Sequence, residues 1–144
     1  MQLQYAILAD SAQILPDGKF VIVGGGVEYI SAPSFPAMNP SLALVVRLTV
    51  SSPEVGREHQ FRLELLMPDG TSVLPVQGNT MFTPKPPTTS GILAPLNYMF
   101  VVNFPGLVFP AAGKYAFRLF VDDHKVGEAP LYLQITPSAA QAPT

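Results

Sequence analysis

The fold is decided by residues 59–76, which read HQFRLELLMPDGTSVLPV. From Phe61 to Met67 every second side chain is apolar and belongs to one face, a period of two that is typical of a half-buried β-strand. Pro68-Asp69-Gly70 then supplies the fixed and the positive φ angles that a tight turn needs. We therefore predict a β-hairpin, with strands over residues 59–67 and 71–76.

The same alternation recurs along the chain, and its segments end in Gly, Pro, Asn or Asp. In segment 42–50 the even positions are apolar, and in segment 114–122 the odd ones are, so we expect these positions to face the core. No segment has the periodicity of a helix. Further strands are predicted over residues 3–9, 19–24, 96–104 and 126–135, with 27–30 extending the second strand or beginning a third, and a turn over 105–113.

Two long proline-rich segments, residues 31–41 and 78–95, separate these strands. Seven to nine short strands joined by such crossings predict an all-β fold, namely an antiparallel β-sandwich with Greek-key, immunoglobulin-like connections. An eight-stranded barrel is the alternative. The sandwich is favoured because the prolines mark strand ends and crossings, whereas a barrel needs continuous pairing.

The composition is that of a globular chain with few charges. Its 144 residues are 48% hydrophobic and 12% charged, with a net charge of −2, which excludes intrinsic disorder. The length corresponds to one domain, predicted over residues 1–136, with a flexible tail over residues 137–144. Lys and Arg are scattered without a run or a stripe, so nucleic acid is not expected as a partner.

Compartment and cofactors are predicted from what the sequence lacks. No apolar stretch is long enough for a transmembrane helix. Residues 1–15 lack the basic start of a signal peptide, and Asp10 interrupts their apolar run. The absence of cysteine excludes disulfides and thiolate metal ligands. We therefore predict a cytoplasmic protein with no membrane partner, no metal and no cofactor.

Three parts of the chain carry a resemblance to a known family: Tyr5–Asp10, Gly18–Phe20 together with Gly24–Gly26, and Gly113–Asp122. They resemble a family of small, uncharacterised bacterial β-sandwich proteins. The resemblance covers nearly the whole chain, and it implies the sandwich fold without an assigned activity. The closing hairpin is also similar to the last hairpin of many immunoglobulin-like domains.

The triplet Gly24-Gly25-Gly26 follows a predicted strand, and a phosphate-binding loop is one interpretation of it. That chemistry needs a helix after the glycines and a lysine nearby, whereas Val27–Ile30 has the character of a strand. We therefore expect a bulge or a sharp bend, at which only glycine tolerates the backbone angles.

Two sites combine a histidine with carboxylates. Asp122-Asp123-His124 offers metal ligands or acid–base groups, but no second cluster completes a coordination shell, so a polar hairpin turn is expected. His59, beside Glu58, is expected to be a solvated residue at a strand end. An enzyme would need a pocket that brings His59 or His124 to a carboxylate. Neither Gly-x-Ser-x-Gly nor Ser-x-x-Lys occurs, and we predict no enzymatic activity.

Side chains that face outward lead to the functional prediction. Most aromatic rings fall on the predicted inner faces, where core packing explains them. The exposed candidates are Met99 and Val101 on the uncharged strand 96–104, Phe120 on the strand 114–122, and Phe35 and Phe82 in the proline-rich loops. A surface this poor in charge favours contact with other proteins.

We predict a non-enzymatic β-sandwich that acts through protein–protein contacts, with a protein partner or with itself as a homo-oligomer. The alternative is a sandwich that binds a small molecule or a carbohydrate with loops 31–41 and 78–95. Strand 96–104, which carries no charge, is expected to be either an interface or the middle of a sheet covered on both sides.

Overall fold

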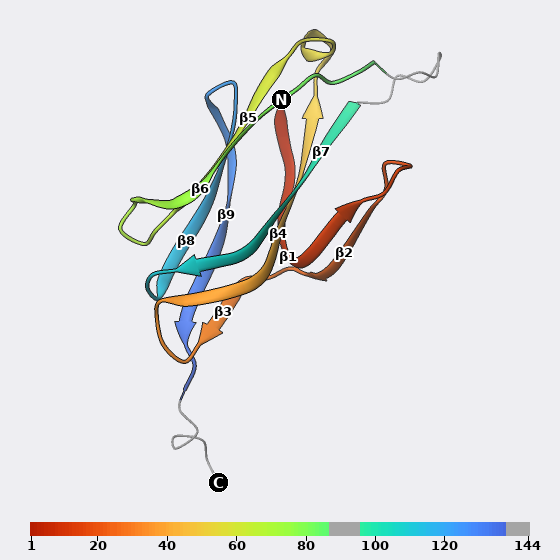
Figure 1. Ribbon diagram of the computed structural model, residues 1–144. Helices are drawn as coiled ribbons and strands as arrows, with labels where there is room; N and C mark the ends of the chain where they lie inside the picture. Colours follow the sequence, from red (N-terminus) through yellow and green to blue (C-terminus); the bar gives the residue numbers. More distant parts are fainter. Residues whose placement is uncertain (87–95, 138–144) are drawn as a thin grey trace.

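The computed structural model describes residues 1–86 and 96–137 as two β-sheets that pack against each other (Figure 1). The first sheet consists of β1 (Gln2–Ile14), β2 (Phe20–Gly25), β4 (Ala37–Val50) and β7 (Leu96–Phe109). The second consists of β3 (Tyr29–Ala32), β5 (His59–Leu66), β6 (Ser72–Phe82), β8 (Gly113–Val121) and β9 (His124–Ile135). Within the described ranges, the one helical element is a 3-10 turn, η1 (Ser52–Glu54).

The strand order is β2-β1-β4-β7 in the first sheet and β3-β9-β8-β5-β6 in the second. Paired strands are antiparallel, except that β3 runs parallel to β9. The all-β prediction is confirmed, and the two sheets do not form a barrel.

The main core lies between the sheets and is built by the predicted alternation. The even positions of β4 from Leu42 to Val50 and the odd positions of β8 from Tyr115 to Val121 are all at most 5% exposed. Across the sheets, the ring of Phe61 in β5 stacks on Phe100 in β7 with 4.3 Å between ring centroids. Burying one Leu or Phe side chain completely stabilises the folded state by about 1.5–3 kcal/mol. The predicted inner faces of both strands are therefore confirmed, and they provide the main stabilisation.

Strands β4 and β7 are longer than predicted, because they accommodate prolines. The sequence predicts a loop over residues 31–41 and a turn over residues 105–113, but residues 37–41 and 105–109 pair with each other. Pro105 lies on an edge strand, and Pro40 precedes the part of β4 that pairs with β1, so their missing N–H groups are tolerated. Strand β6 likewise continues to Phe82, inside the second predicted loop. Residues 87–95 of that loop lie outside the described residues.

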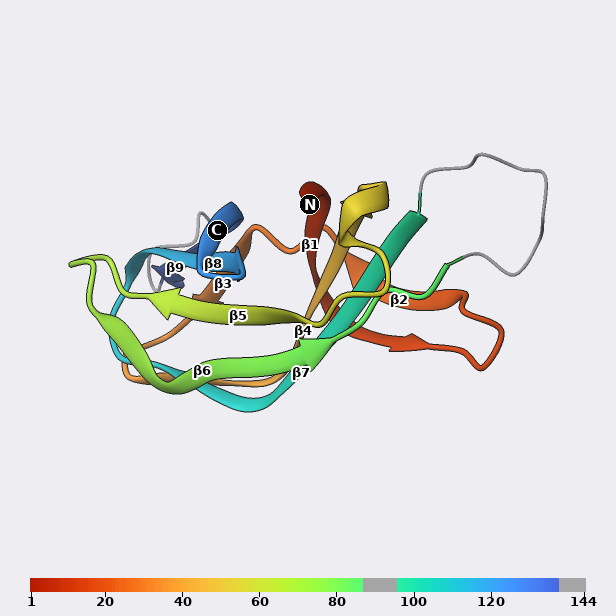
Figure 2. The same cartoon turned by 90° about the horizontal axis from the view of Figure 1, so that it is seen from above.

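Strand β1 changes partner part-way along its length. Up to Ala9 it pairs with β4, and from Ala9 onward it pairs with β2 in a hairpin that projects from the side of the molecule (Figures 1 and 2). On the outer face of the first sheet, Ala12 and Ile22 of the hairpin pack with Ala43 and Val45, which are 0% exposed. Strand β7 ends the strand order, so the alternative that strand 96–104 lies in the middle of a sheet is wrong, although the hairpin covers part of its outer face. The other alternative, an interface, stays a prediction.

Candidate functional site: the β1–β2 hairpin

A tight turn over Pro16-Asp17-Gly18 joins β1 to β2, as the sequence predicts. The N–H of Leu15 donates to the carbonyl of Lys19 at 2.7 Å, and the N–H of Gly18 donates to the carbonyl of Leu15 at 2.9 Å. Gly18 has a φ of 86°, in the left-handed region that favours glycine. These bonds set the register of the hairpin from its tip onward.

The turn also determines which backbone groups of β2 stay open. In an antiparallel ladder, successive residues alternate between bonding to the partner strand and pointing away from it. Since Leu15 and Lys19 are hydrogen-bonded to each other, the N–H and C=O groups of Phe20 and Ile22 point to the open side of β2. Strand β2 is the first strand in its sheet, so this open side is an edge to which another strand can be added.

The face of β2 that is turned away from the sheet is apolar and exposed. Val21 is 39% exposed and Val23 is 56% exposed. No residue of β2 is charged. Charged side chains are one means by which proteins protect edge strands from pairing with other chains. Strand β2 lacks that protection.

Gly24 lies at a bend that requires glycine. It has a φ of 63°, and a Cβ at this position would lie 2.1 Å from the Oδ2 of Asp10. Gly26 has a φ of 85°, and its N–H and that of Val27 both donate to the carbonyl of Leu8. The predicted bend is confirmed, and it directs the chain out of the hairpin toward β3.

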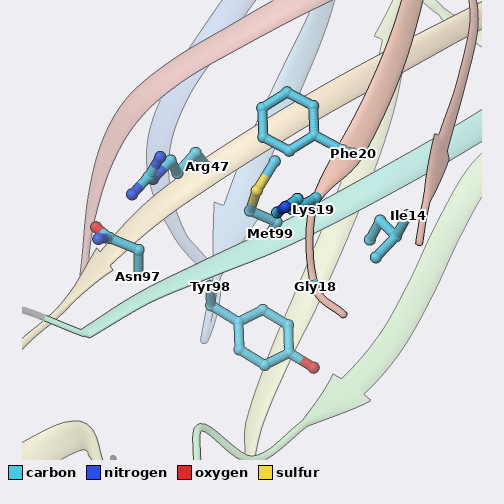
Figure 3. Close-up of a pocket in the computed structure, with 8 residues that line it drawn as sticks. All are labelled: Ile14, Gly18, Lys19, Phe20, Arg47, Asn97, Tyr98 and Met99. Carbon is cyan, nitrogen blue, oxygen red and sulfur yellow. The ribbon is translucent and has the colours of Figure 1, made fainter. Parts of the chain in front are cut away.

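A groove of about 700 Å³ lies between the hairpin and strands β4 and β7 (Figure 3). This volume falls in the range of small-molecule sites. Ile14 and Phe20 from the hairpin and Met99 from β7 provide apolar lining. The charged lining residues are Lys19 at the hairpin tip and Arg47 on β4, and both are cations. The other lining residues are Gly18, Asn97 and Tyr98.

Arg47 is the unusual member of this lining. It is half-buried on β4, where it lies between Tyr5 of β1 and Met99 of β7. Within the part of the chain that the structure describes, its buried Nε has no hydrogen-bond partner and no carboxylate pairs with its guanidinium. A buried donor without an acceptor costs about 1–3 kcal/mol. The described residues provide no counter-charge for a cation at this position.

The prediction for His59 is wrong, because the ring is buried and not solvated. It is 6% exposed, its Nδ1–H donates to the Oδ2 of Asp122 at 2.6 Å, and its Nε2–H donates to the carbonyl of Glu54 at 2.8 Å. Both ring nitrogens face acceptors, an arrangement that only the imidazolium satisfies fully. Burial alone lowers the pKa of His59, but the two acceptors outweigh it and the pKa is raised, while the hydrogen bond from His59 lowers the pKa of Asp122.

Asp122 belongs to the predicted polar turn, which is confirmed. Asp122 and Asp123 have φ angles of 50° and 64°, a region that Asp tolerates better than most residues. The Asp122 carboxylate ties this turn to β5 through the His59 ring and the N–H of Gln60. Since both nitrogens of His59 are occupied, we assign this cluster a structural role. Over residues 1–86 and 96–137, no three His, Cys, Asp or Glu side chains gather as a metal site would require.

Two of the five candidate interface residues, Met99 and Val101, lie on the outer face of β7. Both are half-buried, and both pack against the small cluster that the hairpin forms with the sheet. The sequence suggests that a partner protein covers these two side chains. The β1–β2 hairpin of the same chain covers part of them instead.

The other three candidates lie on different parts of the fold. Phe120 is half-buried, with the guanidinium carbon of Arg62 only 4.0 Å from its ring centre. Phe35 is half-buried and packs against the main core. Phe82 is 5% exposed at the end of β6, and its ring lies against that of His59. The predicted loop position of Phe82 is wrong, because the strand extends to this residue and turns its ring into the core.

Sequence reasoning did not single out Val21, Val23 or Arg47. Alternation identifies β2 as a strand and Arg47 as an outward-facing residue, but it does not tell which strand is an edge. One signal was available, since β2 combines three β-branched residues with no charge. That combination is unusual for an edge strand.

The match to known families covers both sheets. A profile described as a family of unknown function, DUF6941, matches residues 4–134. The chain belongs to the DUF6941 family. Membership in DUF6941 confirms that the chain belongs to an uncharacterised family, as the sequence motifs indicate. No curated protein and no solved structure matches the chain. Among the described residues of this DUF6941 member, no helix has the length and hydrophobicity of a membrane span.

Proposed function

We propose that this protein is a non-enzymatic interaction domain that pairs with a second copy of itself through the open edge of β2. The observation that carries the proposal is an edge strand with no charge and two exposed valines, whose outer backbone groups have no strand partner among residues 1–86 and 96–137. Such an edge is a template for β-strand addition.

A second copy is the occupant that suits this edge best. Two β2 strands related by a two-fold axis near Ile22 run antiparallel, and each offers the other the same open N–H and C=O groups. No like charges oppose each other across the axis, because β2 has none. The pairing joins two four-stranded sheets into one of eight strands and brings the exposed valines of both copies together.

Light scattering over a concentration series tests the proposal. The wild type is expected to change from monomer to dimer as the concentration rises. Val21→Lys and Val23→Lys are expected to remain monomeric, since like charges across an edge oppose pairing. Val108→Lys is the matched control, because Val108 is 48% exposed but lies on β7, away from the β2 edge. This variant is expected to dimerise like the wild type. A wild type that is monomeric at every concentration overturns the proposal, as do dimers of the β2 variants.

The finer classification of the fold is also a proposal: an immunoglobulin-like sandwich with Greek-key connections. Two observations support it. A short strand, β3, runs parallel to β9 at the edge of the β9-β8-β5 sheet. The Tyr115 hydroxyl of β8 donates to the carbonyl of Ala111 at 2.7 Å, which is similar to the tyrosine corner of immunoglobulin-like domains. A crystal structure with a different strand order would overturn this classification.

The expectations about cellular location, origin and other partners stay predictions. They are a cytoplasmic location, a bacterial origin, and the absence of nucleic-acid, membrane and cofactor partners. The scattered basic residues support the absence of a nucleic-acid partner, and the absence of cysteine is consistent with a cytoplasmic location. Fractionation of cells that express the tagged protein tests the location, and recovery in a membrane or extracellular fraction would contradict it.

A further inference from the structure

The groove beneath the hairpin lies on the other face of β2 from the exposed valines. Phe20 lines the groove, whereas Val21 and Val23 alternate with Ile22, which packs toward the sheet, so the valines lie on the opposite face of the strand. The exposed valines and the groove are therefore on opposite faces of β2.

The charged part of the groove is cationic. Lys19 and Arg47 line it, and no acidic residue is among its described lining. The Nζ of Lys19 is 3.7 Å from the Asp17 carboxylate, but these side chains are 80% and 56% exposed, so water screens the pair. Arg47 has no carboxylate partner within the described ranges. Two positive charges thus face one groove, in a chain whose net charge is −2.

An apolar wall lies beside these cations. Figure 3 shows the Phe20 ring next to Met99, with the guanidinium of Arg47 to one side. We propose that the groove binds a small organic anion, namely a carboxylate carried on a flat apolar body. The carboxylate pairs with the guanidinium of Arg47, and the body packs on Phe20 and Met99. The ligand thus supplies a negative charge to Arg47, for which the described residues provide no carboxylate partner.

Isothermal titration calorimetry with naphthoate, and with the neutral naphthamide as a matched probe, tests the ligand class. Naphthoate is expected to bind at least about tenfold more tightly than naphthamide, because only the acid offers a charged acceptor. Equal affinities for acid and amide overturn the proposal. So does the absence of naphthoate binding at millimolar concentrations.

Arg47→Met tests the site, because it removes the charge and keeps an apolar stem of similar length. It is expected to weaken naphthoate binding at least about tenfold and to leave naphthamide binding unchanged. Arg118→Met is the matched control, since Arg118 is also half-buried and its Nε also lacks a hydrogen bond, but it pairs with Glu128 at 3.9 Å. This control is expected to bind naphthoate like the wild type.

Thermal unfolding of Arg47→Met separates a binding role from a structural one. Loss of an unpaired, half-buried charge is expected to leave Tm unchanged or to raise it. A lower Tm, or failure to fold, assigns Arg47 a structural role and overturns the proposal. Unchanged naphthoate affinity in the folded variant overturns it as well.

Discussion

Replacing Asp122 with Asn removes the negative charge from the contact with His59 and keeps the shape of the turn. Asn also tolerates the φ of 50° at this position. In the wild type both ring nitrogens of His59 face oxygen acceptors, so the imidazolium is the satisfied form. In Asp122→Asn the amide can present an N–H to Nδ1, which satisfies the neutral ring. The substitution is therefore expected to lower the pKa of His59.

The pH range of the effect follows from the directions of the two shifts. The pKa of His59 is raised in the folded state, so its stabilisation is complete below its ordinary pKa of about 6.5 and is lost as the pH rises through the folded value. The pKa of Asp122 is lowered, so its stabilisation is present above its ordinary pKa of about 3.9 and is lost as the pH falls through the folded value. The pair therefore stabilises the fold most between about pH 4 and pH 6.5.

The expected loss is about 1 kcal/mol in the free energy of unfolding near pH 5.5, the difference between a charge-assisted and a neutral hydrogen bond. We take the lower end of that difference because the Asp122 side chain is 48% exposed. For 144 residues this corresponds to a fall of about 3 °C in Tm. Near pH 8 the loss is expected to be smaller than at pH 5.5, since the neutral ring gains nothing from the carboxylate charge and the Asn amide satisfies it.

Thermal unfolding followed by circular dichroism at both pH values measures this effect. Asp123→Asn is the matched control, because Asp123 shares the turn with a φ of 64°, is 79% exposed and lies 3.8 Å from Arg62. Its Tm is expected to stay at the wild-type value at both pH values. An equal loss of Tm at both pH values in Asp122→Asn would refute the charge argument, and so would an equal loss in the control.

Three further predictions test the fold by urea unfolding. Tyr115→Phe is expected to lower the free energy of unfolding by about 1–3 kcal/mol, because the hydroxyl that bonds to Ala111 is buried. An unchanged free energy of unfolding would contradict the role of that contact. Gly24→Ala is expected to destabilise the protein more than Gly18→Ala does. Both positions have a positive φ, but only the Cβ added at Gly24 would clash with another residue, Asp10. Equal losses in the free energy of unfolding would argue against the clash. Leu65→Ala, at a position that is 0% exposed, is expected to lose about 2–5 kcal/mol, and a loss typical of a surface site would contradict its place in the core.

Much of the fold could be predicted because its signals are local. A period of two identifies which side chains of β4 and β8 are buried, since adjacent residues of a strand point to opposite faces. The turns at Pro16-Asp17-Gly18, Pro68-Asp69-Gly70 and Asp122-Asp123 depend on the φ preferences of their own residues. Each of these features is determined within a few positions of the chain.

The lengths of β4 and β7 could not be predicted in this way. A proline is excluded from a strand only where its missing N–H faces a neighbouring strand. Whether Pro40 and Pro105 face a neighbour depends on the strand order, which brings together segments more than sixty residues apart. Local composition therefore indicated loops where the structure has long strands.

The all-β class, the inner faces of the strands and the positions of the turns follow from the order of the residues, because these depend on short-range periodicity and backbone preference. Three other features arise only in the folded chain: β2 is an open edge, the hairpin packs on the outer face of its sheet, and Arg47 lines a groove. The same holds for the contact of His59 with Asp122, which lies 63 positions further along the chain. The candidate site belongs to this second group, because edges, grooves and buried ion pairs arise only where distant segments come together.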